Sequence, residues 1–175
     1  MIQYHDAEWG TPLHIDQELF EFICLEGAQA GLSWQTILNK RENFRKAFDN
    51  FDPQKIVKYG DDKISRLLQN AGIIRNKGKI NAIISNAAVF LQLQEEYGSF
   101  DKYIWKFVDH KPILNKRKEM SDIPAKTDIA NLMSKELKKI GFKFVGPTIC
   151  YAFMQATGMV NDHVVSCFRY KEVQE

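Results

Sequence analysis

Glu26 has an unusual position for a residue of its type. Leu19, Phe22 and Ile23 form an apolar stripe at helical spacing, and Glu26 falls on the same stripe, four residues after Phe22. A carboxylate on an inward face is costly to bury unless it is paired or used in chemistry. The pattern predicts either a functional carboxylate or a glutamate that reaches solvent at the end of its helix. Trp34 follows a short glycine-bounded connection, which predicts an aromatic ring near the carboxylate.

His163 and Cys167 are residue types that bind zinc, and they lie four positions apart. One helical turn would place both side chains on the same face. His5, near the other end of the chain, is a possible third ligand. Such a pair also arises by chance, so a metal site and an accidental spacing both stay open. His14 and His110 have no such company, and we expect them to face solvent.

Residues 137–148 have the pattern of a helix, a short hairpin and a second helix, with Gly141 and Gly146 bounding the hairpin. Such a hairpin can turn unpaired backbone N–H groups outward at a helix N-terminus, where they can bind a phosphate. Lys143 adds an attraction to the DNA backbone that does not depend on base sequence. A plain hairpin of two helices, without a ligand, is the alternative.

Charge is distributed unevenly along the chain. Residues 1–30 contain six acidic residues and no Lys or Arg, so residues 31–175 carry 24 − 16 = +8. This asymmetry suggests an anionic polymer as partner, although ordinary surface charge gives the same pattern. Arg75, Lys77 and Lys79 surround a glycine-marked turn into a helix, where basic residues oppose the helix dipole. That opposition makes a phosphate partner more attractive.

Length and composition exclude several protein classes. The chain has 175 residues and a mass of 20.3 kDa, and it is 45% hydrophobic and 26% charged, which excludes disordered and fibrous proteins. No apolar stretch approaches the roughly 18–20 residues of a membrane span, and no secretory signal is visible. Three cysteines, at positions 24, 150 and 167, form no disulfide framework. We therefore expect a cytoplasmic protein with no membrane partner.

Helical spacing runs through nearly the whole sequence and predicts an all-α fold. Start signals lie at Ser33, Asp52-Pro53, Ser99 and Gly146-Pro147, and stop signals lie at Gly72, Gly98 and Gly141. The last pair of helices is expected to bury Ile129, Leu132, Met133, Leu137 and Ile140 from its first member. Residues 109–126 are expected to form the only long loop.

Four sequence blocks together resemble the bacterial 3-methyladenine DNA glycosylase I family, within the helix-hairpin-helix glycosylase superfamily. They are YHDAEWG (4–10), ICLEGAQAGLSW (23–34), AGIIRNKGKI (71–80), and GFKFVGPTICY (141–151) continuing to VNDH (160–163). The blocks occur in family order and span nearly the whole chain. The resemblance implies a helix-hairpin-helix DNA glycosylase-like helical bundle. It also implies one glycosylase domain over residues 1–175, made of two packed helical halves, with the hairpin motif at about 135–157.

The resemblance implies a base-excision repair enzyme that flips N3-methyladenine out of DNA and hydrolyses its glycosidic bond. Glu26 matches the family's base-recognising carboxylate and is the catalytic candidate, Trp34 matches the stacking residue, and Tyr4 matches a pocket tyrosine. Trp9 is expected to support the pocket wall. The alkylated base is cationic and already leaves easily, so selecting this base matters more than strong acid catalysis.

The resemblance also implies the DNA contacts. Leu32 matches the side chain that is wedged into the gap in the duplex. The hairpin, with Gly141, Lys143, Gly146 and Thr148, is expected to bind the backbone. The expected partner is alkylated double-stranded DNA, and the protein is expected to act as a monomer.

Two positions depart from other helix-hairpin-helix glycosylases. Asn161 stands where many of them have a catalytic Asp, a loss that the 3-methyladenine branch shares. Thr148 stands where the bifunctional relatives have a nucleophilic Lys. The enzyme is therefore expected to be monofunctional, with no lyase step. A catalytically silent DNA-binding module and an enzyme for another alkylated purine stay open as alternatives.

The resemblance implies a structural zinc site of two Cys and two His. His5, His163 and Cys167 match three of these ligands. The second family Cys lies in a leader before the YHD block, and this sequence starts at Met1. We therefore expect the fourth position to be taken by water or an outside group, or the site to be empty.

Overall fold

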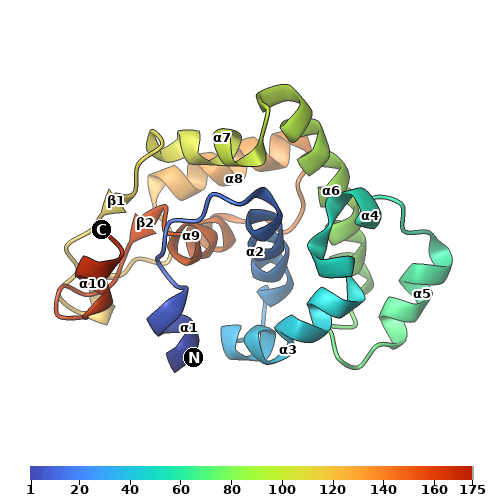
Figure 1. The fold of residues 1–175 in the computed structure, drawn as a ribbon, viewed down its shortest axis with the longest axis horizontal. Helices are drawn as coiled ribbons and strands as arrows, with labels where there is room; N and C mark the ends of the chain where they lie inside the picture. Colours follow the sequence, from blue (N-terminus) through green and yellow to red (C-terminus); the bar gives the residue numbers. More distant parts are fainter. Residues whose placement is uncertain (175) are drawn as a thin grey trace.

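One helix, α2 (Asp16–Gln29), lies at the centre of the fold, and every residue from 19 to 28 in it is buried. It packs against α3, α6, α7 and α9 (Figure 1). A helix that neighbours enclose in this way is expected to be apolar on all sides, which makes its buried polar residues informative. The computed structural model describes residues 1–174.

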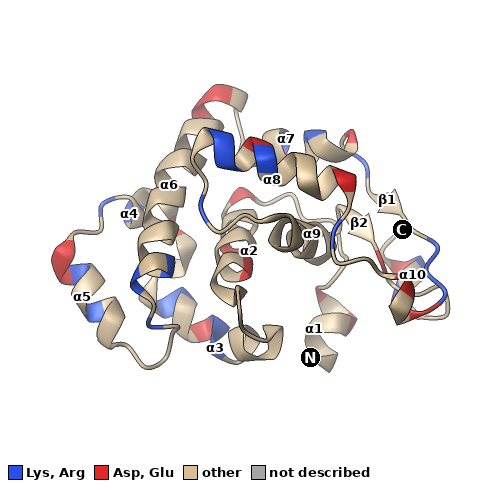
Figure 2. Cartoon of the chain, turned by 180° about the vertical axis from the view of Figure 1, so that it is seen from behind, with Lys and Arg blue, Asp and Glu red and all other residues tan. Residues whose placement is uncertain are grey.

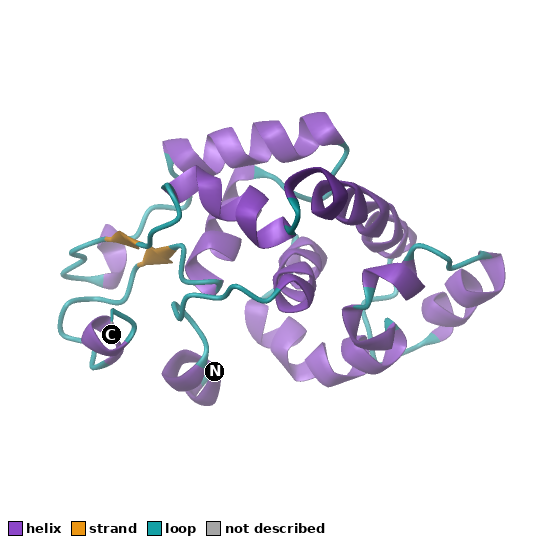
Figure 3. Cartoon of the chain, turned by 45° about the horizontal axis from the view of Figure 1, so that its top comes forward, coloured by secondary structure: helices purple, strands orange, loops and turns teal. Residues whose placement is uncertain are grey.

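The other elements follow in chain order, and helices dominate the fold (Figure 3). The remaining α-helices are α1 (Ile2–Ala7), α3 (Trp34–Ala47), α4 (Pro53–Ile56), α5 (Asp61–Gln69), α6 (Lys77–Tyr97), α7 (Phe100–Trp105), α8 (Asp128–Ile140), α9 (Pro147–Ala156) and α10 (Arg169–Glu172). Short 3-10 turns are η1 (Asp49–Phe51), η2 (Lys106–Val108) and η3 (Met120–Asp122). Two short strands, β1 (Ile113–Leu114) and β2 (Val160–Asn161), pair in parallel.

The predicted all-α class and most predicted helix ends are confirmed. The Ser33 hydroxyl accepts a hydrogen bond from the Thr36 N–H at 3.2 Å, which caps the start of α3. Gly98 and Gly141 end α6 and α8 with left-handed φ values of 82° and 112°. These ends are local interactions between residues close in sequence, and sequence patterns read them well.

Three predictions about helices and loops are wrong in detail. α5 ends at Gln69, before the predicted stop at Gly72. Residues 109–126 contain β1 and η3 in addition to loop. Leu132 is 52% exposed, because the inward stripe of α8 passes instead through Ala130, Met133, Ser134 and Leu137. The division of the chain into two packed helical halves stays a prediction.

Polar side chains fix the two ends of α2. The Asp16 carboxylate accepts from the backbone N–H groups of Phe100 and Asp101, each at 2.8 Å, and from the Gln94 side chain at 2.6 Å. The start of α2 is thereby tied to the junction of α6 and α7. At the other end, Lys79 of α6 donates to carbonyls of the last turn. α2, which carries Glu26, is therefore held at both ends by contacts remote in sequence.

Candidate active site

Glu26 lies in the last turn and a half of α2 and is only 3% exposed. Its Oε2 atom is buried and has no hydrogen-bond partner among residues 1–174. Burial raises the pKa of Glu26 from an ordinary 4.5 to about 8. The alternative in which this glutamate reaches solvent at the helix end is therefore wrong.

Tyr4 lies close to this carboxylate, and Trp34 packs against Tyr4. Tyr4 on α1 is 6% exposed, and its hydroxyl also has no partner in the described part of the chain. Burial, and then the negative charge of Glu26, raise the pKa of Tyr4. The Tyr4 and Trp34 rings have centroids 5.7 Å apart and planes tilted by 53°. Buried polar atoms are nearly always hydrogen-bonded in proteins, so two neighbouring exceptions indicate a site that a ligand completes.

An apolar cavity of about 310 Å³ opens beside these residues. Tyr4, Trp9 and Trp34 line it, together with His5, His163 and Met120. Its volume lies at the low end of the range for small-molecule sites. Trp9 lines this cavity, with its ring centroid 4.6 Å from that of His163 at an edge-on angle of 81°. Glu26 does not line this cavity, and its link to the cavity runs through Tyr4.

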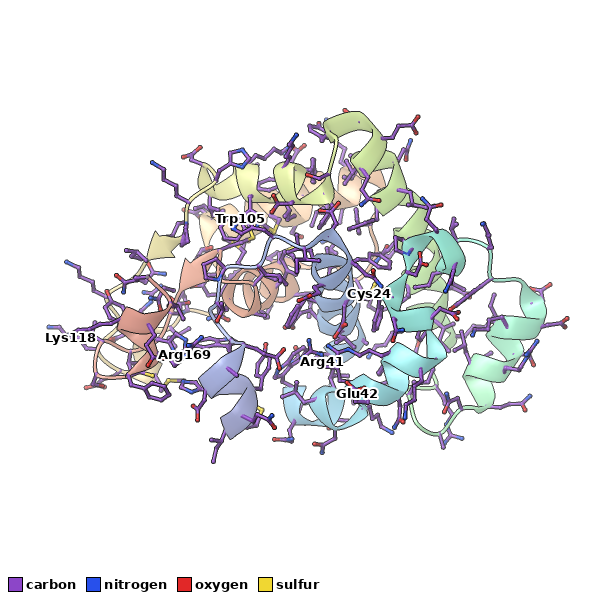
Figure 4. The ribbon with its side chains drawn as sticks, viewed as in Figure 1. Cys24, Arg41, Glu42, Trp105, Lys118 and Arg169 are labelled. Atoms are coloured by element: carbon purple, nitrogen blue, oxygen red, sulfur yellow. The ribbon has the colours of Figure 1, made fainter. Side chains whose placement is uncertain are left out.

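Arg41 holds together the three helices that carry the candidate residues. Its guanidinium pairs with Glu21 on α2 and with Glu8 directly after α1, both at 2.5 Å, while it lies itself on α3 (Figure 4). The same guanidinium lies 5.0 Å from the centre of the Phe22 ring. The Glu21 side chain is 7% exposed, so this pairing compensates a buried charge. The short α1 is thus fixed in place, with Tyr4 against the pocket.

The three predicted metal ligands converge, although they come from opposite ends of the chain. One ligand atom each from His5, His163 and Cys167 lies within 4.8 Å of the other two. The Cys167 Sγ is 3.6 Å from His5 Nε2 and 3.6 Å from His163 Nδ1. Zinc–nitrogen bonds of about 2.05 Å and zinc–sulfur bonds of about 2.3 Å at a tetrahedral angle also give about 3.6 Å. The two sulfur–nitrogen distances therefore fit a tetrahedral metal, and two imidazoles and a thiol are donors that zinc prefers.

The remaining nitrogen of each histidine has an oxygen partner. His5 Nδ1 is 2.8 Å from Asp6 Oδ1, and His163 Nε2 is 3.0 Å from the Trp9 carbonyl. Such outer contacts orient the imidazoles of metal sites. The helical turn expected between His163 and Cys167 is wrong. A tight turn, closed by the Cys167 N–H on the Val164 carbonyl at 2.8 Å, brings the two side chains together instead.

Asp162 is as buried as Glu26 but is fully paired. Its Oδ1 accepts from Asn115 and Arg117, and its Oδ2 accepts from Tyr151 and Gln155, at 2.5–3.0 Å. These donors hold the pKa of Asp162 below its usual value despite burial. The carboxylate therefore joins the 109–126 segment to α9. The side chain of the preceding residue, Asn161, donates a hydrogen bond to the Tyr170 carbonyl and accepts one from the His163 N–H.

The predicted DNA-binding residues lie on exposed turns. Leu32 is 40% exposed at the tip of the turn between α2 and α3. The hairpin between α8 and α9 exposes Gly141 and Lys143, Gly146 is half-buried at the N-cap of α9, and Thr148 is exposed in the first turn of α9. Figure 2 shows Lys and Arg on α8 and near the start of α6 on the side of the molecule that it presents. Exposed basic side chains placed in this way could reach the phosphates of a DNA backbone.

Sequence reasoning missed the residues that hold these turns. Asn86 is 3% exposed and forms two hydrogen bonds with the Lys143 backbone. A signal was present, because Asn86 lies on the inward stripe of α6, three residues after Ile83 and four before Phe90. The Arg41 and Asp162 networks had no comparable local signal, since their partners are far apart in sequence.

The raised pKa of Glu26 predicts a pH-dependent stability. Between about pH 4.5 and pH 8 the unfolded chain has lost a proton that the folded chain still holds, so rising pH favours unfolding through this group. Glu26→Gln removes the effect. The unfolding free energy of Glu26→Gln minus that of the native protein is expected to rise by up to about 1.4 kcal/mol per pH unit across this range. Above it the difference should level off.

Urea unfolding at a series of pH values measures this difference. Glu18→Gln, at an exposed position on the same helix, is the control and should show no such trend. A difference between Glu26→Gln and the native protein that does not change with pH would contradict the burial argument.

The comparison with known proteins agrees with this geometry. A family model described as methyladenine glycosylase matches residues 1–170. DNA-3-methyladenine glycosylase 1 of Escherichia coli (strain K12) is 53% identical over 169 residues, covering 97% of this chain and 90% of that protein. A crystal structure of a 3-methyladenine DNA glycosylase I has a TM-score of 0.93 at 53% identity, covering 95% of this chain and 92% of that one.

A further solved structure addresses 3-methyladenine recognition by the 3-methyladenine DNA glycosylase I of Staphylococcus aureus. It has a TM-score of 0.93 at 38% identity, and it covers 95% of this chain and 89% of that one. The family resemblance predicted from the sequence blocks is confirmed by these matches and by the family model. The chain belongs to the methyladenine glycosylase family.

Proposed function

We propose that this protein is a base-excision repair glycosylase that releases N3-methyladenine from alkylated double-stranded DNA. The observation that carries the proposal is that Tyr4 Oη, in the wall of an aromatic cavity, and the nearby Glu26 Oε2 are buried and have no hydrogen-bond partner among residues 1–174. A flipped purine would supply the missing hydrogen-bond partner and stack on Trp34. The protein would act in the cytoplasm as a monomer.

The burial of Glu26 gives a physical basis for choosing a damaged base. Its carboxylate is costly to ionise in the free protein, because it is buried and its Oε2 atom has no donor among residues 1–174. A base that carries a positive charge provides this compensation, whereas ordinary adenine is neutral. The exocyclic amine edge of the base would donate to the carboxylate. Selection would therefore rest on charge as well as shape.

The chemistry demands little further machinery. Methylation at N3 places a positive charge on the base, so the base leaves as a neutral molecule while positive charge develops on the sugar. Asn161 cannot provide a negative charge for that sugar, and both oxygens of Asp162 already accept hydrogen bonds. Thr148, at the position of the lyase lysine, offers no amine for a Schiff base. We infer a monofunctional enzyme that depends on the charge of its substrate.

We also propose a structural zinc ion held by His5, His163 and Cys167. The support is the spacing of the three ligand atoms and the oxygen partner of each imidazole. When bound, zinc would supply a cross-link between the two ends of the chain. It would brace α1, on which Tyr4 neighbours His5, and would take no part in breaking the glycosidic bond.

The first prediction from the proposed function concerns excision of the base. The protein should release 3-methyladenine from methylated DNA and leave 7-methylguanine in place, as measured by chromatography of the released bases. Glu26→Gln should lower the excision rate about 10- to 100-fold, because a hydrogen bond to a charged group is worth about 1.5–3 kcal/mol. Glu18→Gln, exposed on the same helix, should retain the native rate. An unchanged rate in Glu26→Gln, or a native protein that only binds DNA, would refute the assignment.

The second prediction concerns the absence of a lyase step. Borohydride added during turnover should trap no covalent adduct between protein and DNA, because no amine stands at the matched position. DNA that contains hypoxanthine, a neutral lesion, should stay intact. An adduct would show that another lysine reaches the sugar, and efficient release of hypoxanthine would show that a group other than the substrate charge lowers the barrier.

The third prediction concerns the metal. Protein purified without chelators should contain zinc by elemental analysis, and Cys167→Ser should contain less. A chelator should lower the melting temperature of the native protein and have little effect on Cys167→Ser. His14→Ala, a change at an exposed histidine outside the cluster, should keep its zinc. Zinc-free native protein would remove this proposal and leave the glycosylase proposal standing.

A further inference from the structure

Lys79 points inward, unlike the basic residues around it. Its ammonium donates to the Ala28 carbonyl at 2.8 Å and to the Ala30 carbonyl at 2.7 Å. Both carbonyls belong to the C-terminal end of α2, whose own last turn contains no basic residue. A positive charge here compensates the negative end of the helix dipole and pairs carbonyls that the helix leaves open. Lys79 is half-buried, whereas Arg75 and Lys77 are exposed.

Leu32, the residue expected to be wedged into the DNA duplex, follows shortly after these carbonyls. Leu32 comes two residues after Ala30, and the turn continues into α3 at Trp34. The turn residue Gly31 has a left-handed φ of 79° and no neighbour within 4 Å of an added Cβ. Packing therefore does little to fix this turn at Gly31, and the Lys79 contacts lie directly before it.

The same helix also holds the hairpin. Seven residues after Lys79, which is about two helical turns and thus the same face, the Asn86 side chain accepts from the Lys143 N–H at 2.8 Å and donates to the Lys143 carbonyl at 3.1 Å. The last turn of α2, directly before the Leu32 turn, also lies against the hairpin, since a Cβ on Gly27 would lie 3.2 Å from the Phe144 Cβ. One face of α6 therefore sets the distance between the Leu32 turn and the hairpin.

We propose that Lys79 is a positioning residue that fixes the Leu32 turn against α6, so that the wedge and the hairpin engage DNA in a set register. The proposal rests on the DNA glycosylase function proposed above. The competing role is a phosphate contact, which the basic segment around Lys79 suggests on its own. The geometry opposes that role, because two of the three ammonium donors are already used within the protein.

Salt dependence separates the two roles. Binding to duplex DNA is measured over a range of salt concentrations for the native protein, Lys79→Met and Lys77→Met. A phosphate contact contributes about −0.9 to the slope of log K against log salt. Lys79→Met should leave the slope unchanged, and a slope reduced by about 0.9 would overturn the proposal. Lys77→Met, at an exposed neighbouring position, should show the reduction and thereby prove that the assay detects a single contact.

Catalysis provides the second test. Lys79→Met should lower the single-turnover excision rate at saturating DNA on the order of tenfold or more, because a small displacement of a positioning element is costly. Its binding of free 3-methyladenine should stay native, which a general loss of structure would not allow. Loss of free-base binding in parallel with excision would overturn the proposal.

A double-mutant cycle with Leu32→Ala completes the experiment. If Lys79 acts through the wedge, Lys79→Met should have little further effect on excision once Leu32 is truncated. An equal loss in both backgrounds would overturn the proposal. Should Lys79→Met not fold, Lys79→Gln takes its place in the cycle. A native protein that releases no base would refute the proposed function, and the salt slopes would still decide whether Lys79 contacts phosphate.

Discussion

A buried carboxylate with one oxygen that receives no hydrogen bond from residues 1–174 is the constraint around which this helical structure is organised. Glu26 and Asp162 are both almost fully buried, and their surroundings are opposite. Asp162 receives four hydrogen bonds, which favour its ionised form and hold its pKa low. Glu26 has an oxygen with no partner in the described part of the chain, and burial raises the pKa of Glu26 to about 8. The protein can satisfy a buried carboxylate where it serves structure, and it leaves Glu26 unsatisfied.

Keeping such a site requires a rigid surround, because a loose structure would move to solvate the charge. α2 is held at its start by the hydrogen bonds of Asp16 and at its end by Lys79. Arg41 of α3 pairs with Glu21 of α2 and with Glu8 directly after α1, and so ties these three helices together. These contacts are ionic or charge-assisted, and breaking one partner of a buried pair is costly. The stability of the helices around the site thus supports a local arrangement that is itself unfavourable.

The candidate site shares its supports with the two turns proposed to contact DNA, the Leu32 turn and the hairpin between α8 and α9. α2 carries Glu26 and ends next to the turn of Leu32, and α6 contacts both that turn and the hairpin. The C-terminal segment brings His163 and Cys167 to His5, one residue after Tyr4. A displacement of α6 would therefore move both of these turns, and a displacement of the N-terminal helix would move Tyr4 in the cavity wall.

The sequence by itself determined the features that depend on near neighbours in the chain. Helical spacing, the Ser33 cap and the left-handed glycines at 98 and 141 predicted the helices, and the position of Glu26 on an apolar stripe marked it as unusual. Only the tertiary structure decided that one Glu26 oxygen has no hydrogen-bond partner among residues 1–174. It also decided that Lys79 points inward and that Asp162 pairs with the 109–126 segment. Leu132 shows the same limit, because its exposure depends on which stripe of α8 meets the core. Caps and helical periods are set within a few residues, whereas the direction of a long polar side chain is set by partners that the fold brings from dozens of residues away.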